Sequence, residues 1–450
     1  MGKTRSLTEG KILNTLIRFA IPVFFALFLQ ALYGGVDLLV VGQFAQTADV
    51  SGVATGSMLL QTVTMIITGL TMGITILVGE KIGEKRPKEA GEAIGGGICL
   101  FAVLGIVLTI VLVGGAKFIA GLMQAPESAF DQTVTYIRIC GAGSIFIVAY
   151  NVLGGVFRGI GDSKTPLLTV AIACVVNIFG DLLLVAVFHM GTAGAALATV
   201  AAQAVSVLIS FLVIRKKTLP FIFSRKCIRF SKRIIGTELR LGVPVALQEF
   251  LVGISFLVIQ MIVNTFGVEA SAGVGVAEKV CSFLMLVPSA YTQSMSAFVA
   301  QNMGAGNPMR AKKALACGIG TSLIAGIIMG YLAFFHGDIL ASIFSADDLV
   351  IADAHSYLKA YAIDCLLTPF LFCFTGYYNG REKTLFVMIQ GIVGAFCVRI
   401  PIVYAVSRIA GATLFEIGLG TPASSLVQIT LCLIMFVWME KKENGRLKQA

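Results

Sequence analysis

The chain alternates between long apolar stretches and short polar segments along its whole length. About twelve stretches, each of roughly 20 to 27 residues, are rich in Leu, Ile, Val, Ala and Gly, and helices of that length span a bilayer. Because hydrocarbon cannot hydrogen-bond an exposed backbone, the pattern predicts an all-α polytopic membrane protein. The expected spans are residues 16–41, 53–78, 93–115, 133–157, 166–188, 193–214, 241–265, 272–300, 314–335, 352–378, 385–407 and 414–438.

Composition supports this interpretation. Hydrophobic residues make up 57% of the chain and charged residues only 13%, about half the charged share of a typical soluble domain. The first apolar run is too long for a signal-peptide core and lacks a small-residue cleavage pattern. We therefore expect it to remain in the protein as the first span.

Lys and Arg residues mark one side of the membrane. Under the positive-inside rule, the polar segments that hold them, and with them both termini, face the cytoplasm. The same rule accounts for the net charge of +10, and its spread over short segments argues against a nucleic-acid partner. Most of the 34 Lys and Arg residues lie near the two termini and in segments 81–88, 158–164, 215–240, 310–313 and 381–383.

Thiol and imidazole groups indicate no metal centre. The ten Cys residues form no CxxC pair and lie nearly all within apolar stretches, where a thiol packs as a small hydrophobe. Only three His residues are present. We expect no disulfide framework, no organic cofactor and no His-based metal site.

The two halves of the chain resemble each other at an offset of about 220 residues. Three pairs of landmarks recur in the same order, and in each pair both members fall on the predicted cytoplasmic side. They are IPV (21–23) with VPV (243–245), KIGEKRPKEA (81–90) with NMGAGNPMRA (302–311), and GDSKT (161–165) with GREKT (380–384).

Each half holds six predicted helices. An even number gives both halves the same orientation, so the repeats are related by an axis along the membrane normal. We predict an N-lobe over residues 1–214, a basic cytoplasmic linker over 215–240 and a C-lobe over 241–450. Two parallel six-helix bundles that face each other across a cleft suit alternating access.

Polar side chains from three spans of the first half fall at a similar depth. Asp37 lies about one turn below the outer end of the first span, and Asp181 about two turns below the outer end of the fifth. Asn177 shares a helical face with Asp181, and Thr199 lies about two turns into the sixth span. A carboxylate near the bilayer centre costs about 2.5–3.5 kcal/mol, so an acid at this depth indicates a function. Together the four residues predict a site for Na⁺ or a shared proton; each alone also fits a polar contact between helices.

The second half carries its own pair of acids. Glu249 and Asp364 lie nearer the middle of the seventh and tenth spans, and Tyr361 shares a helical face with Asp364. A carboxylate pair in a cleft attracts an organic cation or a second coupling ion. The alternative is an ion pair with Arg399 or Lys359.

Over essentially its whole length the chain resembles the multidrug and toxic compound extrusion (MATE) transporters. The resemblance rests on LYGGVDLLVVGQF around Asp37, on the loops KIGEKRPKEA and FRGIGDSKTP, and on NIFGD, which holds Asn177 and Asp181. It implies two six-helix lobes that form a V-shaped cleft, and a monomer. It also implies export of amphipathic, often cationic, organic compounds by antiport with H⁺ or Na⁺.

The resemblance also implies roles for single residues. Binding of H⁺ or Na⁺ is expected to bend or repack the first helix near Pro22, which serves as a hinge. Acids in both lobes leave the coupling ion open, and the apolar content and short loops suit a bacterial plasma (inner) membrane. Asp37, Asn177, Asp181 and Thr199 match the amino-lobe cation site of the family, and Glu249, Tyr361 and Asp364 resemble the carboxy-lobe site of one branch.

Three other functions compete with export. A flippase for a lipid-linked saccharide has similar architecture and needs cations in the cleft, for which Arg138 and Arg399 are available. An intramembrane hydrolase would use Asp37 and Asp181 as a paired acid and base, but no other catalytic signature is present. In a non-transporting scaffold the buried acids would have no function. We therefore expect a transporter and not an enzyme.

Overall fold

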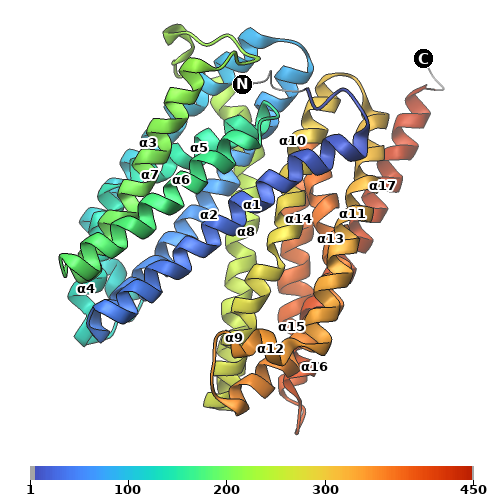
Figure 1. Ribbon diagram of the computed structural model, residues 1–450. Helices are drawn as coiled ribbons and strands as arrows, with labels where there is room; N and C mark the ends of the chain where they lie inside the picture. Colours follow the sequence, from blue (N-terminus) through green and yellow to red (C-terminus); the bar gives the residue numbers. More distant parts are fainter. Residues whose placement is uncertain (1–5, 448–450) are drawn as a thin grey trace. The chain divides into compact units, whose positions relative to one another are not determined.

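The computed structural model describes residues 6–447, with side chains up to residue 443, and the terminal charges used for the orientation prediction lie partly outside this range. The described residues form helices and no strand (Figure 1). The α-helices are α1 (Ile12–Phe44), α2 (Thr47–Gly83), α3 (Pro87–Leu122), α4 (Phe130–Ala142), α5 (Ser144–Gly159), α6 (Lys164–Asp181), α7 (Gly191–Lys216), α8 (Lys232–Val263), α9 (Val268–Leu284), α10 (Leu286–Gly304), α11 (Pro308–Phe335), α12 (Gly337–Ser342), α13 (Asp348–Gly380), α14 (Thr384–Ile392), α15 (Ile400–Ser407), α16 (Leu414–Gly418) and α17 (Gly420–Leu447). Short 3₁₀ segments are η1 (Glu127–Ala129), η3 (Arg225–Cys227) and η4 (Asn264–Phe266), and π-helical segments are η2 (Leu182–Val187) and η5 (Val393–Arg399).

Membrane-spanning helices dominate this arrangement. Within the described part of the chain, 11 helices or helix runs are long and apolar enough to cross a bilayer, and one bent pair supplies a twelfth span. The prediction of an all-α polytopic membrane protein is therefore confirmed. The helices extend several residues beyond the predicted apolar runs, as α3 does from Pro87, because polar residues at their ends continue the helix into the loops.

The fourth predicted span is not one straight helix. It consists of α4 and α5, which are inclined by 54° to each other. The break falls at Gly143, which packs closely against Val200 of α7. Residues 272–300 likewise comprise two helices in succession, α9 and α10, which count as one span because they continue each other across Met285.

Two compact units make up the structure. The first contains the chain through Ala246 together with Ala300–Pro308, and the second contains Leu247–Val299 and the chain from Met309. The boundary therefore falls within α8, and the predicted linker 215–240 belongs to the first unit. The division into lobes at residues 214 and 241 stays a prediction.

Two sets of hydrogen bonds hold α6 and α7 in place within the first unit. At one end, Asp49 of α2 accepts hydrogen bonds from the backbone nitrogen (2.9 Å) and the hydroxyl (2.7 Å) of Thr192. At the other, Asp162 accepts from the Thr165 hydroxyl (2.6 Å) and from Lys217 Nζ (2.5 Å). The start of α6 and both ends of α7 are thus fixed, which limits movement of the two helices along each other.

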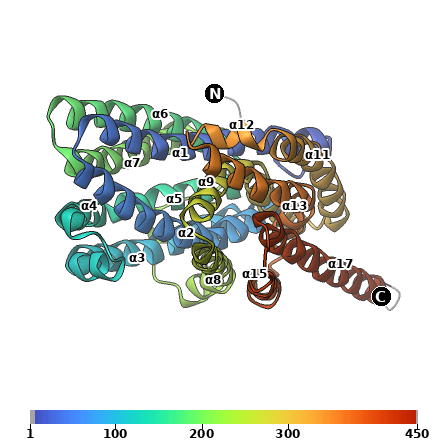
Figure 2. The ribbon, with the colours of Figure 1, turned by 90° about the horizontal axis from the view of Figure 1, so that it is seen from below.

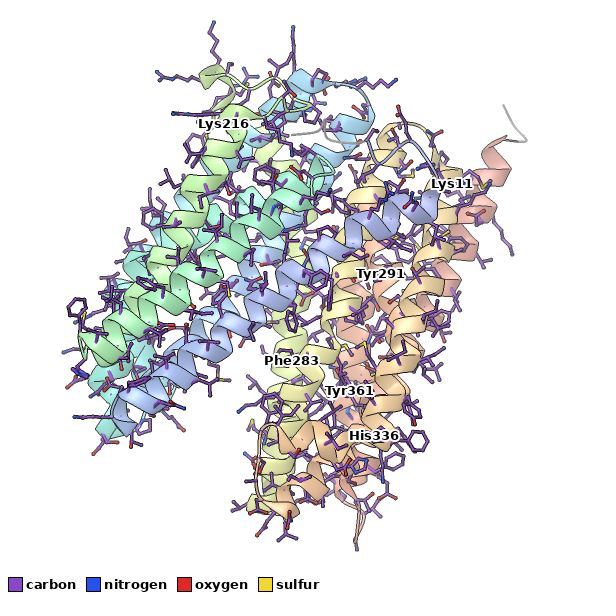
Figure 3. The ribbon with its side chains drawn as sticks, in the orientation of Figure 1. Lys11, Lys216, Phe283, Tyr291, His336 and Tyr361 are labelled. Carbon is purple, nitrogen blue, oxygen red and sulfur yellow. The ribbon has the colours of Figure 1, made fainter. Side chains whose placement is uncertain are left out.

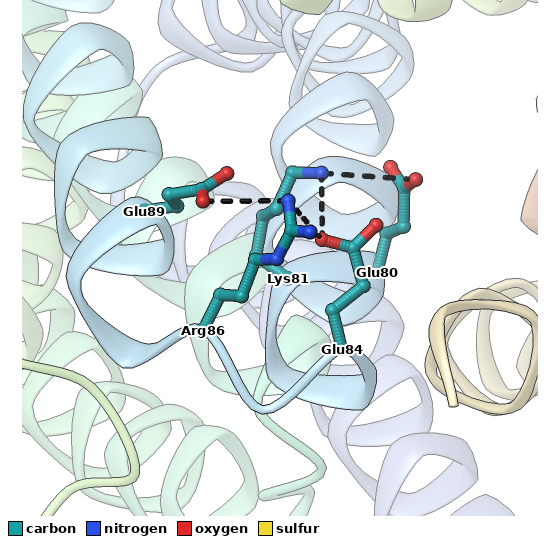
Figure 4. Close-up of polar contacts among 5 residues, drawn as sticks. All are labelled: Glu80, Lys81, Glu84, Arg86 and Glu89. Carbon is teal, nitrogen blue, oxygen red and sulfur yellow. Dashed lines mark hydrogen bonds and ion pairs between the residues drawn. The ribbon is translucent and has the colours of Figure 1, made fainter. Parts of the chain in front are cut away.

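Charged residues surround the turn between α2 and α3 (Figure 4). Lys81 Nζ lies 3.0 Å from a Glu84 carboxylate oxygen and 3.8 Å from one of Glu80, and Arg86 lies 3.4 Å from Glu84 and from Glu89. Ion pairs that solvent can reach contribute little each, about 0–1 kcal/mol. Their joint effect is to hold a tight turn between two long helices.

Candidate functional site

Three helices of the first unit meet at the predicted amino-half site. Asp37 lies on α1, Asn177 and Asp181 on α6, and Thr199 on α7. α6 packs against both α1 and α7, and the three helices run side by side in Figures 1 and 2. Because Asn177 and Asp181 are four residues apart, they present their side chains to the same neighbours.

One hydrogen bond joins α7 to α1 at this point. Thr199 Oγ1 lies 3.2 Å from Asp37 Oδ2 and 3.0 Å from the carbonyl oxygen of Ala195. Asn177 and Asp181 approach Asp37 closely enough to interact with its carboxylate. The structure thus brings the four predicted residues together, while their role in coupling stays a prediction.

The cluster is closed to solvent and holds several oxygens without hydrogen bonds. Asn177 and Asp181 are fully buried, and Asp37 is 5% exposed. Asp37 Oδ1, both carboxylate oxygens of Asp181 and both polar side-chain atoms of Asn177 form no hydrogen bond with any other described residue. A buried polar group without a partner costs about 1–3 kcal/mol. A proton or a small cation would therefore stabilise the cluster.

The chemistry of the donors narrows the choice of cation. Two carboxylates, one amide oxygen and one hydroxyl are hard ligands of the kind that bind Na⁺, and a pair of carboxylates also shares a proton. Among the described residues, no group of three or more His, Cys, Asp or Glu side chains is arranged to hold a metal ion. Oxygen donors of this kind suit H⁺ or Na⁺ better than a transition metal, and the identity of the ion stays a prediction.

Two further residues of this site were missed from the sequence. Tyr136 of α4 is buried and interacts with Thr199. Cys140, one turn later, places its Sγ 4.0 Å from the Ala196 carbonyl oxygen. Asn177 and Asp181 are four residues apart, so the sequence shows that they share a helical face. Which face of α4 meets α7 depends on the rotation of the helix, which the sequence pattern does not give.

A π-helical segment follows Asp181 directly. In η2 the backbone nitrogen of Phe188 donates to the Leu183 carbonyl oxygen at 3.0 Å, a bond that spans five residues instead of four. Single π-helical turns are rare and frequently lie at functional sites. The fifth span therefore departs from α-helical geometry immediately beside the buried carboxylate.

The second unit contains a separate polar cluster around Asp364. Asp364 and Tyr361 lie on α13, where Figure 3 marks Tyr361, and both side chains interact with Arg399 at the end of η5. Arg399 Nη1 donates to Ser255 Oγ at 3.1 Å, and its guanidinium lies 4.4 Å from the centre of the Phe256 ring. Asp364 and Arg399 form no direct ion pair, and Asp364 Oδ1 has no hydrogen bond within the described chain.

Glu249, the predicted partner of Asp364, forms no hydrogen bond with it. Glu249 is on α8 with an exposed side chain, and it forms no hydrogen bond or ion pair with the described residues. Glu278 of α9 is the acid that joins the second cluster, where it interacts with Tyr357 and Cys281. The sequence pattern yielded no functional prediction for Glu278. A coupling or substrate role for Glu249, Tyr361 and Asp364 stays a prediction.

The predicted hinge lies inside an unbroken helix. α1 runs continuously over Ile12–Phe44, and Pro22 is buried within it. Proline removes a backbone donor and so weakens a helix locally. The hinge role of Pro22 stays a prediction.

Comparison with known protein families gives two matches along the chain. The MatE family model matches residues 22–183 and again residues 244–405. The two matched segments correspond to the repeat that the sequence landmarks predict.

Curated proteins similar to this chain share its full length. The "Probable multidrug resistance protein YoeA" of Bacillus subtilis is 26% identical over 99% of this chain and 98% of its own length. The multidrug export protein MepA of Staphylococcus saprophyticus is 23% identical over 95% of this chain and 93% of its own length.

Solved structures show the same fold. A crystal structure of a MATE protein in complex with MaL6 matches with a TM-score of 0.91 at 20% identity, and it covers 100% of both chains. The outward-facing conformation of a multidrug resistance MATE family transporter matches with a TM-score of 0.90 at 19% identity, again over 100% of both chains.

Proposed function

Because this chain belongs to the MatE family of transporters, we propose that it is a secondary active exporter of amphipathic, often cationic, organic compounds, driven by antiport with H⁺ or Na⁺. The curated relatives are multidrug resistance and multidrug export proteins, which supports this class of substrate. We place the protein as a monomer in a bacterial plasma membrane, with both termini in the cytoplasm and no enzymatic step.

The buried cluster of Asp37, Asn177, Asp181 and Thr199 is the observation that carries the proposal. Several of its oxygens form no hydrogen bond with the described residues, and Asp37 and Asp181 lie on different helices. An incoming ion that neutralises these carboxylates therefore reduces the repulsion between α1 and α6. An ion that binds one conformation more tightly than the other shifts the equilibrium between them. Release of that ion on the inner side then resets the transporter.

The energy available to such a cycle is sufficient. One net charge that moves through 100 mV supplies about 2.3 kcal/mol, which supports a gradient of a neutral substrate of roughly fiftyfold. Export of an organic monocation needs two ions per cycle to move one net charge, whereas a one-for-one exchange draws on the ion gradient alone. A pH or Na⁺ gradient adds to this. One or two ions per cycle are therefore enough for drug export.

Efflux from proteoliposomes tests the proposal. Vesicles containing the protein and ethidium are given an H⁺ gradient or a Na⁺ gradient separately, and wild type is compared with Asp37→Asn, Asp181→Asn and the exposed control Asp131→Asn. We expect one gradient to drive efflux in wild type and in the control, and both site variants to lose it while folding normally.

Two results would contradict the proposal. Undiminished efflux in Asp37→Asn and Asp181→Asn would remove the cluster from coupling. If neither gradient drove efflux in wild type, antiport of organic cations would be wrong, and translocation of a fluorescent lipid-linked saccharide would then be measured on the same vesicles.

A further inference from the structure

The segment between α7 and α8 lies along the outside of another helix. It leaves α7 after Lys216, which Figure 3 labels, and Ile222 donates its backbone N–H to the Pro87 carbonyl oxygen at 3.0 Å. The carbonyl oxygens of Ile222 and Cys227 then lie against Gly91 and Gly95 of α3, where any side chain would collide with them. From Pro87 to Gly95 the helix rises about 12 Å, so this segment follows α3 toward the bilayer.

Apolar side chains on this segment are exposed although the segment belongs to no span. Phe230 is 71% exposed, Ile222 54% and Ile228 46%. The positive-inside rule accounts for cations in a cytoplasmic loop, but it gives no reason for exposed aromatic and aliphatic residues among them. A basic segment with apolar side chains is instead typical of elements that lie in the membrane interface. The exposed cations are Arg225, Lys226, Arg229, Lys232 and Arg233.

A cavity opens between this segment and α3. It has a volume of about 270 Å³, and Lys88, Lys226 and Arg229 line it together with one acid, Glu92. Arg229 and Glu92 form an ion pair at 3.1 Å, which leaves the cavity with an excess of positive charge. Lys and Arg side chains that converge in this way suit a phosphate group.

We propose that residues 217–231 form an interfacial anchor that binds the headgroup of an anionic phospholipid. The phosphate lies in the cavity between Lys88, Lys226 and Arg229, while Phe230 inserts beside the lipid chains. Charge complementarity selects an anionic lipid, and the exposed apolar residues select a bilayer over a soluble phosphate. This site is separate from the cation cluster and goes beyond drug export.

Fluorescence quenching tests this site directly. The chain has a single tryptophan, Trp438, so Phe230→Trp in a Trp438→Phe background places one reporter on the anchor. Nanodiscs contain either brominated phosphatidylglycerol or brominated phosphatidylcholine at the same low fraction. Trp438 of the otherwise unchanged protein, which is 53% exposed on α17, serves as the control reporter.

We expect phosphatidylglycerol to quench the Trp at position 230 more strongly than phosphatidylcholine, and more strongly than it quenches Trp438. Each cation near a membrane surface contributes about fivefold in affinity, so Lys88→Gln, Lys226→Gln and Arg229→Gln combined lower the preference about tenfold or more. Lys313→Gln, Lys383→Gln and Lys441→Gln combined remove the same charge elsewhere and leave the preference unchanged.

Three outcomes would overturn the proposal. Equal quenching by the two lipids would show no headgroup site, and absence of quenching would place the segment in water. Loss of the preference when soluble glycerol phosphate is added at millimolar concentration would identify a site for a soluble phosphate instead.

Discussion

Gly83 and Gly304 lie at the same helix crossing, each against the backbone of the other helix. A Cβ atom on Gly83 of α2 would collide with the Gln301 carbonyl oxygen of α10, and one on Gly304 with the Glu80 carbonyl oxygen. Gly83 and Gly304 are equivalent positions of the sequence repeat, and so are Glu80 and Gln301. The crossing is therefore locally symmetric, which the sequence repeat alone did not show.

Gly83→Ala and Gly304→Ala are each expected to destabilise the protein by about 1–3 kcal/mol, because the added methyl group forces two backbones apart. Their equivalent positions predict similar losses in the midpoint of thermal unfolding. Gly320→Ala on α11, where a Cβ meets no neighbour, is the control and should not lower the midpoint. Unchanged stability in either crossing variant would contradict the close approach.

Thr199→Val removes the hydroxyl that donates to Asp37 Oδ2, whereas Thr199→Ser keeps it. A hydrogen bond to a charged group contributes about 1.5–3 kcal/mol, so the valine variant should change the half-saturating concentration of the coupling ion about tenfold or more. The serine variant should stay within about twofold of wild type. The dependence of efflux on ion concentration measures both, and equal behaviour of the two variants would show that the hydroxyl has no part in ion binding.

Glu238→Gln should raise the thermal stability of the protein. Glu238 of α8 is 1% exposed, and neither carboxylate oxygen forms a hydrogen bond with the described residues. An amide of the same shape removes the cost of burying a charge. Glu127→Gln, at an exposed position, should leave the unfolding midpoint unchanged; a lower midpoint in Glu238→Gln would reveal a partner that needs the carboxylate.

Gly95→Ala should detach the segment 217–231 from α3, because the new methyl group would overlap the Cys227 carbonyl oxygen. The half-buried thiol of Cys227 then becomes more accessible, and its labelling by a maleimide, followed by peptide mass spectrometry, should accelerate severalfold. Gly114→Ala lies on the same helix in open space and should leave the labelling rate unchanged. Equal rates in the two variants would contradict the packing of this segment on α3.

The sequence predicted the spans, the repeat and the amino-half cluster because each depends on local pattern. Apolar length gives a span, and the depth of Asp37, Asp181 and Thr199 follows from counting turns along each helix. Which side chains meet between helices depends on rotation and tilt, so Tyr136 and Glu278 were missed and Glu249 was paired with Asp364 without a contact to support it. The break at Gly143 was also missed, since a glycine inside an apolar run is compatible with a straight helix.

The π-helical segment Leu182–Val187 has a mechanical consequence for Asp181. A π-helical turn contains one residue more than the α-helical turn around it. If the extra residue of this segment moved to the N-terminal side of Asp181, Asp181 would rotate by about 100°, the angle of a single residue, while both ends of the span kept their register. The fifth span thus contains one extra residue, which permits the Asp181 carboxylate to turn toward or away from Asp37 while the loops at both ends of the span stay where they are.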